Sequence, residues 1–204
     1  MKIICVGRNY VDHAKELNNP VPKSPLLFLK PQTAIPIKGQ PFFHPEFSND
    51  VHYELELVVR IERIGKFIDE QFAHKYYSEL GLGIDFTARD VQAKLKEKGH
   101  PWEKAKAFDG SAPISQSFIS KGALPEINNI SFHLEKNGER VQSGNTKDMI
   151  FPVHKLINEI SQYFTLKIGD LIFTGTPAGV GKVEIGDVLE GYLEGKKILE
   201  VKVK

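Results

Sequence analysis

The chain has 204 residues, 41% hydrophobic and 26% charged, a composition that excludes disordered and fibrous proteins. Its 27 Lys and Arg residues nearly balance 26 Asp and Glu, and the dispersed basic residues indicate no nucleic-acid partner and no membrane surface. A single cysteine, Cys5, excludes an intrachain disulfide, and no apolar window approaches the ~20 residues of a membrane span. We therefore expect a soluble, cytoplasmic protein.

Short strands dominate the predicted elements. In chain order we expect a strand at 2–6, a helix at 11–17, strands at 26–29 and 53–61, a helix at 70–80, a strand at 81–86, a helix at 89–98, a strand at 130–135, a helix at 153–164, and strands at 170–174, 187–194 and 197–203. Asn137-Gly138 and Glu194-Gly195-Lys196 predict hairpin turns. Irregularly spaced strands with few helices indicate an α+β fold that is mostly β and mostly antiparallel.

The helix predicted at 11–17 contains a candidate catalytic pair. His13 and Glu16 lie three residues apart, so their side chains can touch on one face of the helix. A carboxylate that orients an imidazole is a recurring general-base arrangement. A purely structural surface pair is the alternative interpretation at this point.

The strand predicted at 53–61 contains two acids with a spacing of two. Alternate strand residues share a face, so Glu54 and Glu56 project together while Leu55 and Leu57 enter the core. Two carboxylates directed at one point can bind a hard divalent cation. The alternative is an ordinary strand with a solvated face.

Asp85 ends the next predicted strand and directly precedes a helix, a position where ligand groups gather, so it is a candidate third oxygen ligand. Arg89 and Gln92 share one face of that helix and could hold a carboxylate and a carbonyl of a substrate. Thr87 and Asp90 have the spacing of a capping box. A capped helix with a solvated arginine is the alternative.

Two further candidates lie in irregular segments. Lys106 follows Trp102 in a segment with no clear helix or strand pattern, where a lysine is either partly desolvated and functional or a plain surface charge.

The Gly-rich segment 174–183 is not a phosphate loop, because five residues separate Gly175 from Gly181 and no Ser or Thr follows the lysine. It is either a ligand-binding loop with Thr176 as a hydroxyl donor or a plain turn.

Together and in this order, these motifs resemble the fumarylacetoacetate hydrolase family. They are GRNY at 7–10 with His13, FLKP at 28–31, YELELV at 53–58, the segment 83–92, Lys106 with Pro113 seven residues later, and TGTPAGVG at 174–181. RNYVDHAKEL at 8–17, TARDVQ at 87–92, GHPW-x-x-AK at 99–106 and the run 149–151 are similar to the small acylpyruvate hydrolase and oxaloacetate decarboxylase branch. Asp109 departs from that branch, which bears on substrate choice.

The resemblance implies one catalytic domain over 1–204 with the family's mixed β-roll and a few peripheral helices, a short segment at 1–45 that forms a lid over the site, and a homodimer. It implies Mg²⁺ or Mn²⁺ as cofactor. The implied site residues are Glu54, Glu56 and Asp85 as metal ligands, Arg8, Arg89, Gln92 and Thr176 as substrate-binding groups, Lys106 as a contact of substrate or attacking water, and His13 with Glu16 as the base.

The implied reaction is metal-dependent cleavage of a C–C bond in 2,4-dioxo acids, which turns an acylpyruvate into pyruvate and a carboxylic acid. Oxaloacetate decarboxylation would proceed through the same pyruvate enolate, which a divalent cation stabilises. One alternative keeps the site but isomerises 2-hydroxyhepta-2,4-diene-1,7-dioate or decarboxylates a related dienoate. Another is a β-rich binding protein whose acids hold only a stabilising cation.

Overall fold

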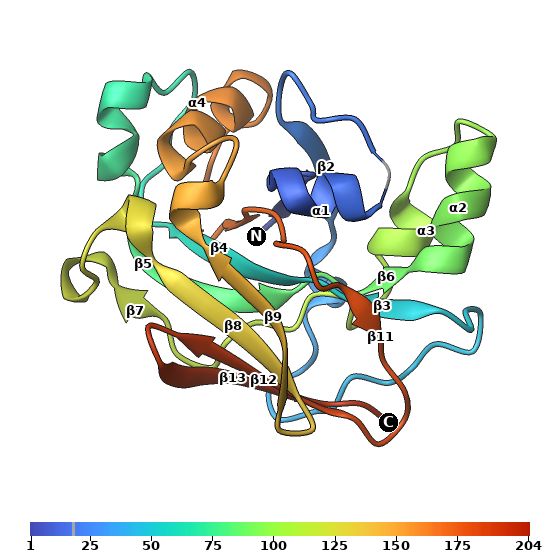
Figure 1. Cartoon of the computed structure of the whole chain (residues 1–204). Helices are drawn as coiled ribbons and strands as arrows, with labels where there is room; N and C mark the ends of the chain where they lie inside the picture. Colours follow the sequence, from blue (N-terminus) through green and yellow to red (C-terminus); the bar gives the residue numbers. More distant parts are fainter. Residues whose placement is uncertain (18) are drawn as a thin grey trace.

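The computed structural model describes residues 1–17 and 19–204, which form three β-sheets with four α-helices around them (Figure 1). The largest sheet has six strands, and every neighbouring pair is antiparallel except β1 with β10, which is parallel. In sheet order these strands are β2 (Leu26–Lys30), β1 (Ile3–Gly7), β10 (Leu171–Phe173), β4 (Leu55–Ile61), β5 (Tyr77–Ile84) and β7 (Ile119–Ser120). The mostly antiparallel α+β prediction is confirmed.

The remaining elements surround this sheet. A three-stranded sheet contains β11 (Gly181–Lys182), β3 (Val51–Tyr53) and β6 (Thr87–Ala88), and a four-stranded sheet contains β13 (Lys196–Lys202), β12 (Val188–Leu193), β8 (Ser131–Lys136) and β9 (Glu139–Asn145). The helices are α1 (Val11–Glu16), α2 (Arg89–Glu97), α3 (Glu103–Lys106) and α4 (Val153–Tyr163). Figure 1 shows α2 and α3 together at one side and α4 at the opposite side.

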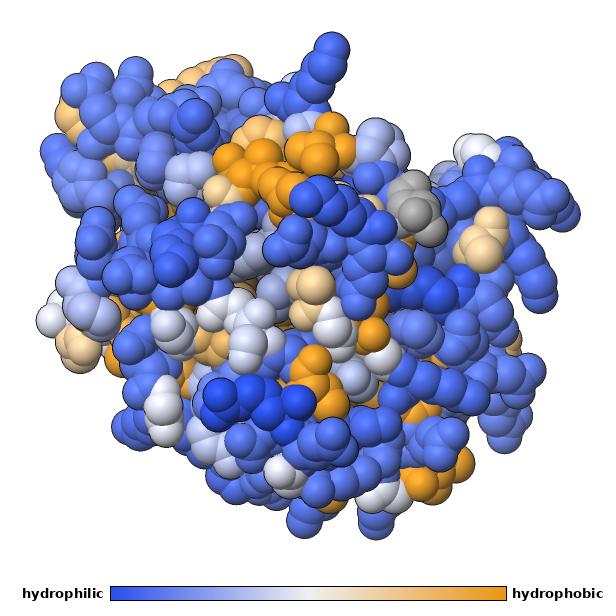
Figure 2. Space-filling model, in the orientation of Figure 1, coloured by the Kyte–Doolittle hydropathy of each residue, from blue (hydrophilic) through white to orange (hydrophobic). Residues whose placement is uncertain are grey.

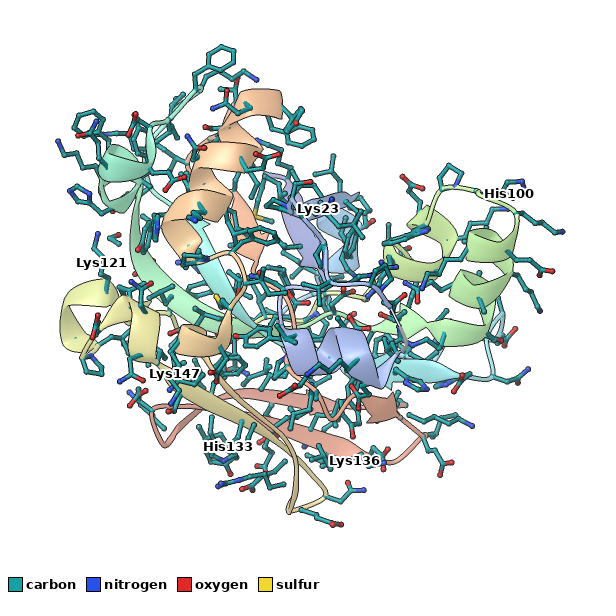
Figure 3. All side chains as sticks on the ribbon, turned by 45° about the horizontal axis from the view of Figure 1, so that its top comes forward. Lys23, His100, Lys121, His133, Lys136 and Lys147 are labelled. Atoms are coloured by element: carbon teal, nitrogen blue, oxygen red, sulfur yellow. The ribbon has the colours of Figure 1, made fainter. Side chains whose placement is uncertain are left out.

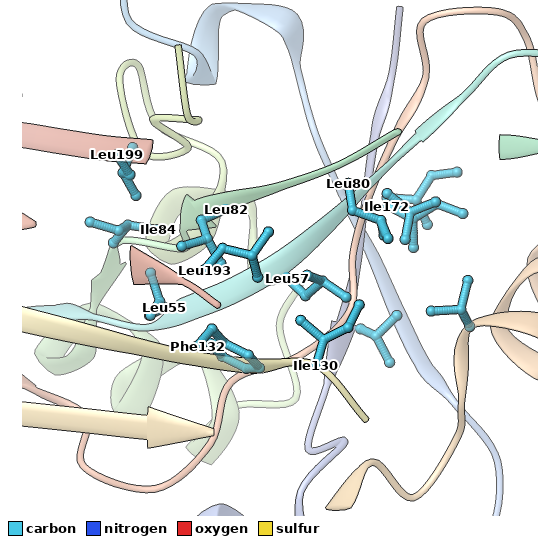
Figure 4. Close-up of a cluster of buried hydrophobic side chains, with 14 of the residues drawn as sticks. Leu55, Leu57, Leu80, Leu82, Ile84, Ile130, Phe132, Ile172, Leu193 and Leu199 are labelled. Atoms are coloured by element: carbon cyan, nitrogen blue, oxygen red, sulfur yellow. The ribbon is translucent and has the colours of Figure 1, made fainter. Parts of the chain in front are cut away.

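The main core lies between the six-stranded and the four-stranded sheets (Figure 4). Alternate residues of β4 and β5 face it, and β8, β12 and β13 cover them. The labelled members include Leu55, Leu57, Leu80, Leu82, Phe132, Leu193 and Leu199. Burial of each such side chain contributes about 1.5–3 kcal/mol to folding. A smaller cluster with Cys5, Val58 and Phe173 covers the other face of the large sheet, so β4 is buried on both sides.

The helix predicted at 70–80 is wrong. A 3₁₀ turn occupies Glu70–Lys75, and β5 begins at Tyr77. Strand pairing overrides the local helical pattern, because β5 pairs along its length with β4 and buries Leu80 and Leu82. The predicted hairpins are confirmed: Asn137 and Gly138 join β8 to β9 with φ of 55° and 82°, and the second turn joins β12 to β13.

The surface in Figure 2 is mostly hydrophilic, with apolar side chains gathered beside α1. Cys5 is fully buried, and burial raises the pKa of its thiol above the ordinary value, so it packs as a small apolar side chain. Within the described residues, no helix combines the length and the apolar character that crossing a membrane requires.

Candidate active site

A pocket opens where β1 and β5 end and β4 begins, beside α1 and α2. Its walls combine charged groups near the sheet with apolar side chains from β2 and the segment before α3. The lining residues are Val6, Gly7, Arg8, His13, Leu17, Asn19, Leu26, Phe28, Glu54, Glu56, Asp85, Arg89, Gln92, Lys96, Trp102, Lys106 and Thr176. Every sequence-predicted site residue except Glu16 lines this pocket. Asp109 is exposed and lies outside it.

Three carboxylates meet at the floor of the pocket. Glu56 lies in β4, Glu54 directly precedes that strand, and Asp85 directly follows β5. The antiparallel pairing of β4 with β5 brings the three together, and the Asp85 N–H donates to the Glu54 carbonyl at 2.8 Å. One oxygen of each carboxylate lies within 4.8 Å of the others, and the residues are at most 5% exposed.

The predicted strand at 53–61 is interrupted at Glu54, between β3 and β4. The side chain of Gln142 in β9 accepts a hydrogen bond from the Leu55 N–H at 2.9 Å, which supplies a partner at the interruption. Leu55 and Leu57 enter the core as predicted. The alternative of a solvated acidic face is wrong, because Glu54 and Glu56 are both buried.

Lys106 connects two of the carboxylates. Its Nζ donates to Glu54 Oε2 at 2.8 Å, to Asp85 Oδ2 at 2.7 Å and to Thr87 Oγ1 at 2.5 Å. Lys106 is 4% exposed and lies at the end of the short helix α3, so the alternative of a plain surface charge is wrong. Its ammonium group also lies over the ring of Phe28, 5.4 Å from the centroid.

Lys30, at the end of β2, is a site residue that sequence reasoning missed. Its Nζ lies 2.7 Å from Asp85 Oδ1 and donates to the Lys106 carbonyl and, at 2.9 Å, to the Ser111 carbonyl. The signal in the sequence is a lysine at the end of an apolar strand, directly before Pro31. Because its ammonium group is fully buried, it needs these partners, and it thereby fixes both Asp85 and the backbone of Lys106.

Arg89 completes the cationic side of the cluster. Its Nη2 lies 2.5 Å from Glu54 Oε1, and its Nη1 donates to Gln92 Oε1 at 3.0 Å. The alternative of a solvated arginine is therefore wrong. The capping-box prediction is also wrong, because Thr87 lies in β6 and bonds Lys106, while Asp90 accepts a hydrogen bond from a serine outside the helix.

The direction of the pKa shift of Glu56 shows that the buried carboxylates repel one another. Burial raises the pKa of Glu56 above its ordinary value, and the nearby Asp85 and Glu54 carboxylates raise it further. Burial also favours a higher pKa for Glu54, but Lys106 and Arg89 outweigh it and hold that pKa well below the usual range. A divalent cation among the three acids would favour the ionised form of Glu56.

The donor set fits such a cation. Hard divalent ions take carboxylate oxygens as ligands, and three converging carboxylates leave further coordination positions open. Glu56 is already oriented, because its Oε2 accepts a hydrogen bond from the Gly175 N–H at 2.7 Å. These observations make Glu54, Glu56 and Asp85 the residues that could hold the metal.

The His13–Glu16 pair lies on α1, and His13 lines the pocket. His13 is buried, and its Nδ1 lies 3.3 Å from Glu16 Oε2. The other oxygen of Glu16 accepts a hydrogen bond from the Gly179 N–H at 3.0 Å, which ties α1 to the loop after β10. Figure 3 shows His100 and His133 on opposite sides of the molecule.

Thr176 belongs to the same loop. Its hydroxyl donates to the Leu55 carbonyl at 2.8 Å and accepts from the Gln142 side-chain amide at 2.9 Å. Gly175, Thr176 and Gly179 all contact site residues or their backbone, so this segment helps to build the site, and its binding of a ligand stays a prediction. Gln142 was missed from the sequence because only the arrangement of β9 against the loop brings it to the site.

The family model named "Fumarylacetoacetate (FAA) hydrolase C-terminal" matches residues 2–204. The chain belongs to the fumarylacetoacetate hydrolase family. Its fold is that of the family: a fumarylpyruvate hydrolase from Pseudomonas aeruginosa, solved with Mn²⁺ and pyruvate, superposes with a TM-score of 0.92 at 35% identity, over 100% of this chain and 89% of that one.

Among curated proteins of the fumarylacetoacetate hydrolase family, the mouse mitochondrial oxaloacetate tautomerase FAHD1 is 43% identical over 202 residues, 99% of this chain and 91% of its own. The mitochondrial oxaloacetate decarboxylase of Dictyostelium discoideum is 44% identical over 195 residues, 95% of this chain and 89% of its own. The protein is thus an enzyme of the oxaloacetate tautomerase and decarboxylase branch of the family, and the alternative of a non-catalytic binding protein is wrong.

Proposed function

We propose that the protein acts on oxaloacetate with a divalent cation, interconverting its keto and enol forms and decarboxylating it to pyruvate. The charge of the site carries this proposal. Lys30, Lys106 and Arg89 balance the charge of the three buried carboxylates, so a bound divalent ion, together with Arg8 and Lys96 in the same pocket, leaves an excess of positive charge for a dianionic substrate. Oxaloacetate is such a dianion.

The cation would be Mg²⁺ or Mn²⁺, bound by Glu54, Glu56 and Asp85. When bound, it would supply Lewis-acid stabilisation of the negative charge that develops on the keto oxygen of the substrate. The Mn²⁺ and pyruvate in the Pseudomonas aeruginosa structure support this assignment. Both ions accept all-oxygen ligands, so the donor set is compatible with either.

The side chains of the pocket have complementary tasks in this proposal. His13 removes a proton from C3 of the keto form and donates it to the C2 oxygen to give the enol, and the reverse transfers restore the keto form, while Glu16 orients the imidazole. Lys106 holds Glu54 and Asp85 in place and adds its positive charge beside the reacting end of the substrate. Arg89, Gln92 and Thr176 bind the pyruvyl part, and Arg8 extends the binding surface outward.

Acylpyruvate hydrolysis is the second candidate function, and the His13–Glu16 pair favours it. A buried imidazole held by a carboxylate can deprotonate a water molecule for attack on the C4 carbonyl, which would expel the pyruvate enolate. The fumarylpyruvate hydrolase relative supports this candidate. Dienoate isomerisation would need the proton shuttle alone and no activated water.

The test compares keto–enol equilibration of oxaloacetate, followed by enol absorbance, with pyruvate release from oxaloacetate and from acetylpyruvate. Each reaction is run with Mg²⁺, with Mn²⁺ and with excess EDTA. Free metal ions promote the oxaloacetate reactions by themselves, so metal without enzyme and metal with a Glu56→Gln variant serve as controls. Enzyme-dependent rates with metal support the proposal, whereas oxaloacetate rates equal to the controls overturn it.

We further propose that the segment 1–45 contributes a lid over the site through α1, which carries His13 and Glu16, whereas β1 and β2 of the same segment belong to the six-stranded sheet. The single catalytic domain over 1–204, the homodimer and the cytoplasmic location stay predictions.

A further inference from the structure

Helix α2 presents a stripe of three polar side chains to the pocket. Arg89, Gln92 and Lys96 are spaced by three and four residues, which places them on one face of the helix, and all three line the pocket. Arg89 contacts the metal-ligand candidate Glu54, and Gln92 contacts Arg89. Lys96 lies one turn further out, and its Nζ donates to the side chain of Asn19 at 3.4 Å across the mouth.

Arg8 reaches the same pocket from the end of β1 in a strained backbone conformation. Its φ of 58° lies in the left-handed region, which costs a non-glycine residue about 1–2 kcal/mol. The next residue, Asn9, fixes this turn: its side chain donates to the carbonyls of Phe151 and Thr174 and accepts from the Phe151 N–H. Retained strain of this kind is typical of functional positions.

Neither outer cation has an acidic partner. Over residues 1–17 and 19–204, no carboxylate forms an ion pair with Arg8 or Lys96, whereas Lys30, Lys106 and Arg89 are all paired with the carboxylate cluster. Lys96 is an exposed residue, and partial desolvation together with the nearby charges of Arg8 and Arg89 lowers its pKa. Such a group of unpaired cations attracts an anion.

We propose that Lys96, with Arg8, binds the second carboxylate of the substrate and thereby selects dicarboxylic 2-keto acids over acylpyruvates with a neutral tail. The proposal rests on the proposed function, in which the other end of the substrate lies at the three carboxylates. The pyruvyl end would meet Arg89 and Gln92, and the distal carboxylate would reach the cations at the mouth.

The first test measures binding without turnover. L-Malate and lactate are non-reactive 2-hydroxy acids that differ in the distal carboxylate, and malate has the carbon chain length of oxaloacetate. Calorimetric titration of the Mn²⁺-loaded protein compares them in the wild type, Lys96→Met, Lys96→Arg and Lys94→Met. Lys94 lies on the opposite, exposed face of α2 and is the matched control.

We expect the wild type and Lys94→Met to bind malate at least about tenfold more tightly than lactate, because one hydrogen bond to a charged group changes the affinity by about this factor. Lys96→Met should weaken malate about tenfold and change lactate less than about twofold, and Lys96→Arg should restore malate binding. Equal affinity of the wild type for both ligands, or equal effects of Lys96→Met on both, would overturn the proposal.

A kinetic comparison separates this proposal from the proposed function. For oxaloacetate, Lys96→Met should raise KM about tenfold, with little change for acetylpyruvate. If no keto acid is turned over but the malate preference still depends on Lys96, the proposed function fails and the carboxylate subsite stands. If oxaloacetate is turned over with an unchanged KM in Lys96→Met, the subsite fails and the proposed function stands.

Discussion

The ammonium group of Lys30 lies 2.7 Å from Oδ1 of Asp85, and both side chains are almost fully buried. This contact connects the edge strand β2 to the end of β5, and it holds Asp85, a candidate metal ligand, in place. Lys106 holds the other oxygen of Asp85. The carboxylate is therefore fixed by two cations before any metal binds.

Replacing Lys30 by Met should be strongly destabilising, because it leaves Asp85 and several carbonyls without their buried partner. We expect the free energy of unfolding, measured by urea denaturation in EDTA, to fall by about 3–5 kcal/mol. Saturating Mn²⁺ should recover part of the loss by neutralising Asp85. Lys98→Met, at an exposed position, is the control and should change stability by less than about 0.5 kcal/mol. A Lys30→Met protein as stable as that control would contradict this account.

Glu56→Gln should separate metal binding from folding. Glutamine removes the charge that Asp85 and Glu54 repel and can still accept from the Gly175 N–H. In EDTA we expect a Tm equal to or above that of the wild type, measured by thermal unfolding. Mn²⁺ should raise the Tm of the wild type and of Glu97→Gln, a control at an exposed position, and leave Glu56→Gln almost unchanged. A full Mn²⁺ shift in Glu56→Gln would show that the metal binds elsewhere.

The pH dependence follows from the raised pKa of Glu56, caused first by burial and then by Asp85 and Glu54. Its folded-state pKa lies above the ordinary 4.5, so its stabilising contribution is complete below that value and is lost as pH rises through the folded pKa. In EDTA, the wild type should therefore lose stability relative to Glu56→Gln as the pH rises above 4.5 through the raised folded-state pKa of Glu56. With metal the sign reverses, because ionised Glu56 is the ligand and Mn²⁺ affinity should increase with pH. If the stability of the wild type and that of Glu56→Gln depended on pH in the same way in EDTA, Glu56 would not be the carboxyl group with the raised pKa.

His13→Ala should lower the enzyme-dependent rates on oxaloacetate and acetylpyruvate by about 100-fold or more, the usual contribution of a general base. Binding of oxalate, an enolate mimic, should be retained in calorimetric titrations, because the carboxylate cluster is intact. His100→Ala, remote from α1, is the control (Figure 3). An unchanged rate would assign the base to another group, and a loss of oxalate binding would indicate that His13 holds the pocket together.

The sequence allowed the carboxylates to be predicted because strand alternation places Glu54 and Glu56 together, and because Asp85 follows an apolar strand. It did not predict what surrounds them. Lys30 and Gln142 reach the site through strand pairing and through packing between segments far apart in the chain, which no local spacing encodes. The β5 strand was mistaken in part for a helix for the same reason: its pairing with β4 decides its conformation.

Gly175→Ala should disturb both the fold and the metal site. Gly175 has a φ of +98°, and an added Cβ would lie 2.6 Å from the Asn9 Cβ and 3.1 Å from the Val6 carbonyl oxygen. Gly39 has a φ of +83° with open space around it, so Gly39→Ala is a matched control that carries only the backbone cost of about 1–2 kcal/mol. Gly175→Ala should lose a further 1–3 kcal/mol or so by overpacking. Its Mn²⁺ affinity should also fall, because the N–H that orients Glu56 is displaced. Equal losses of stability in the two variants, measured by urea denaturation with unchanged Mn²⁺ affinity, would show that the loop tolerates the contact and does not position Glu56.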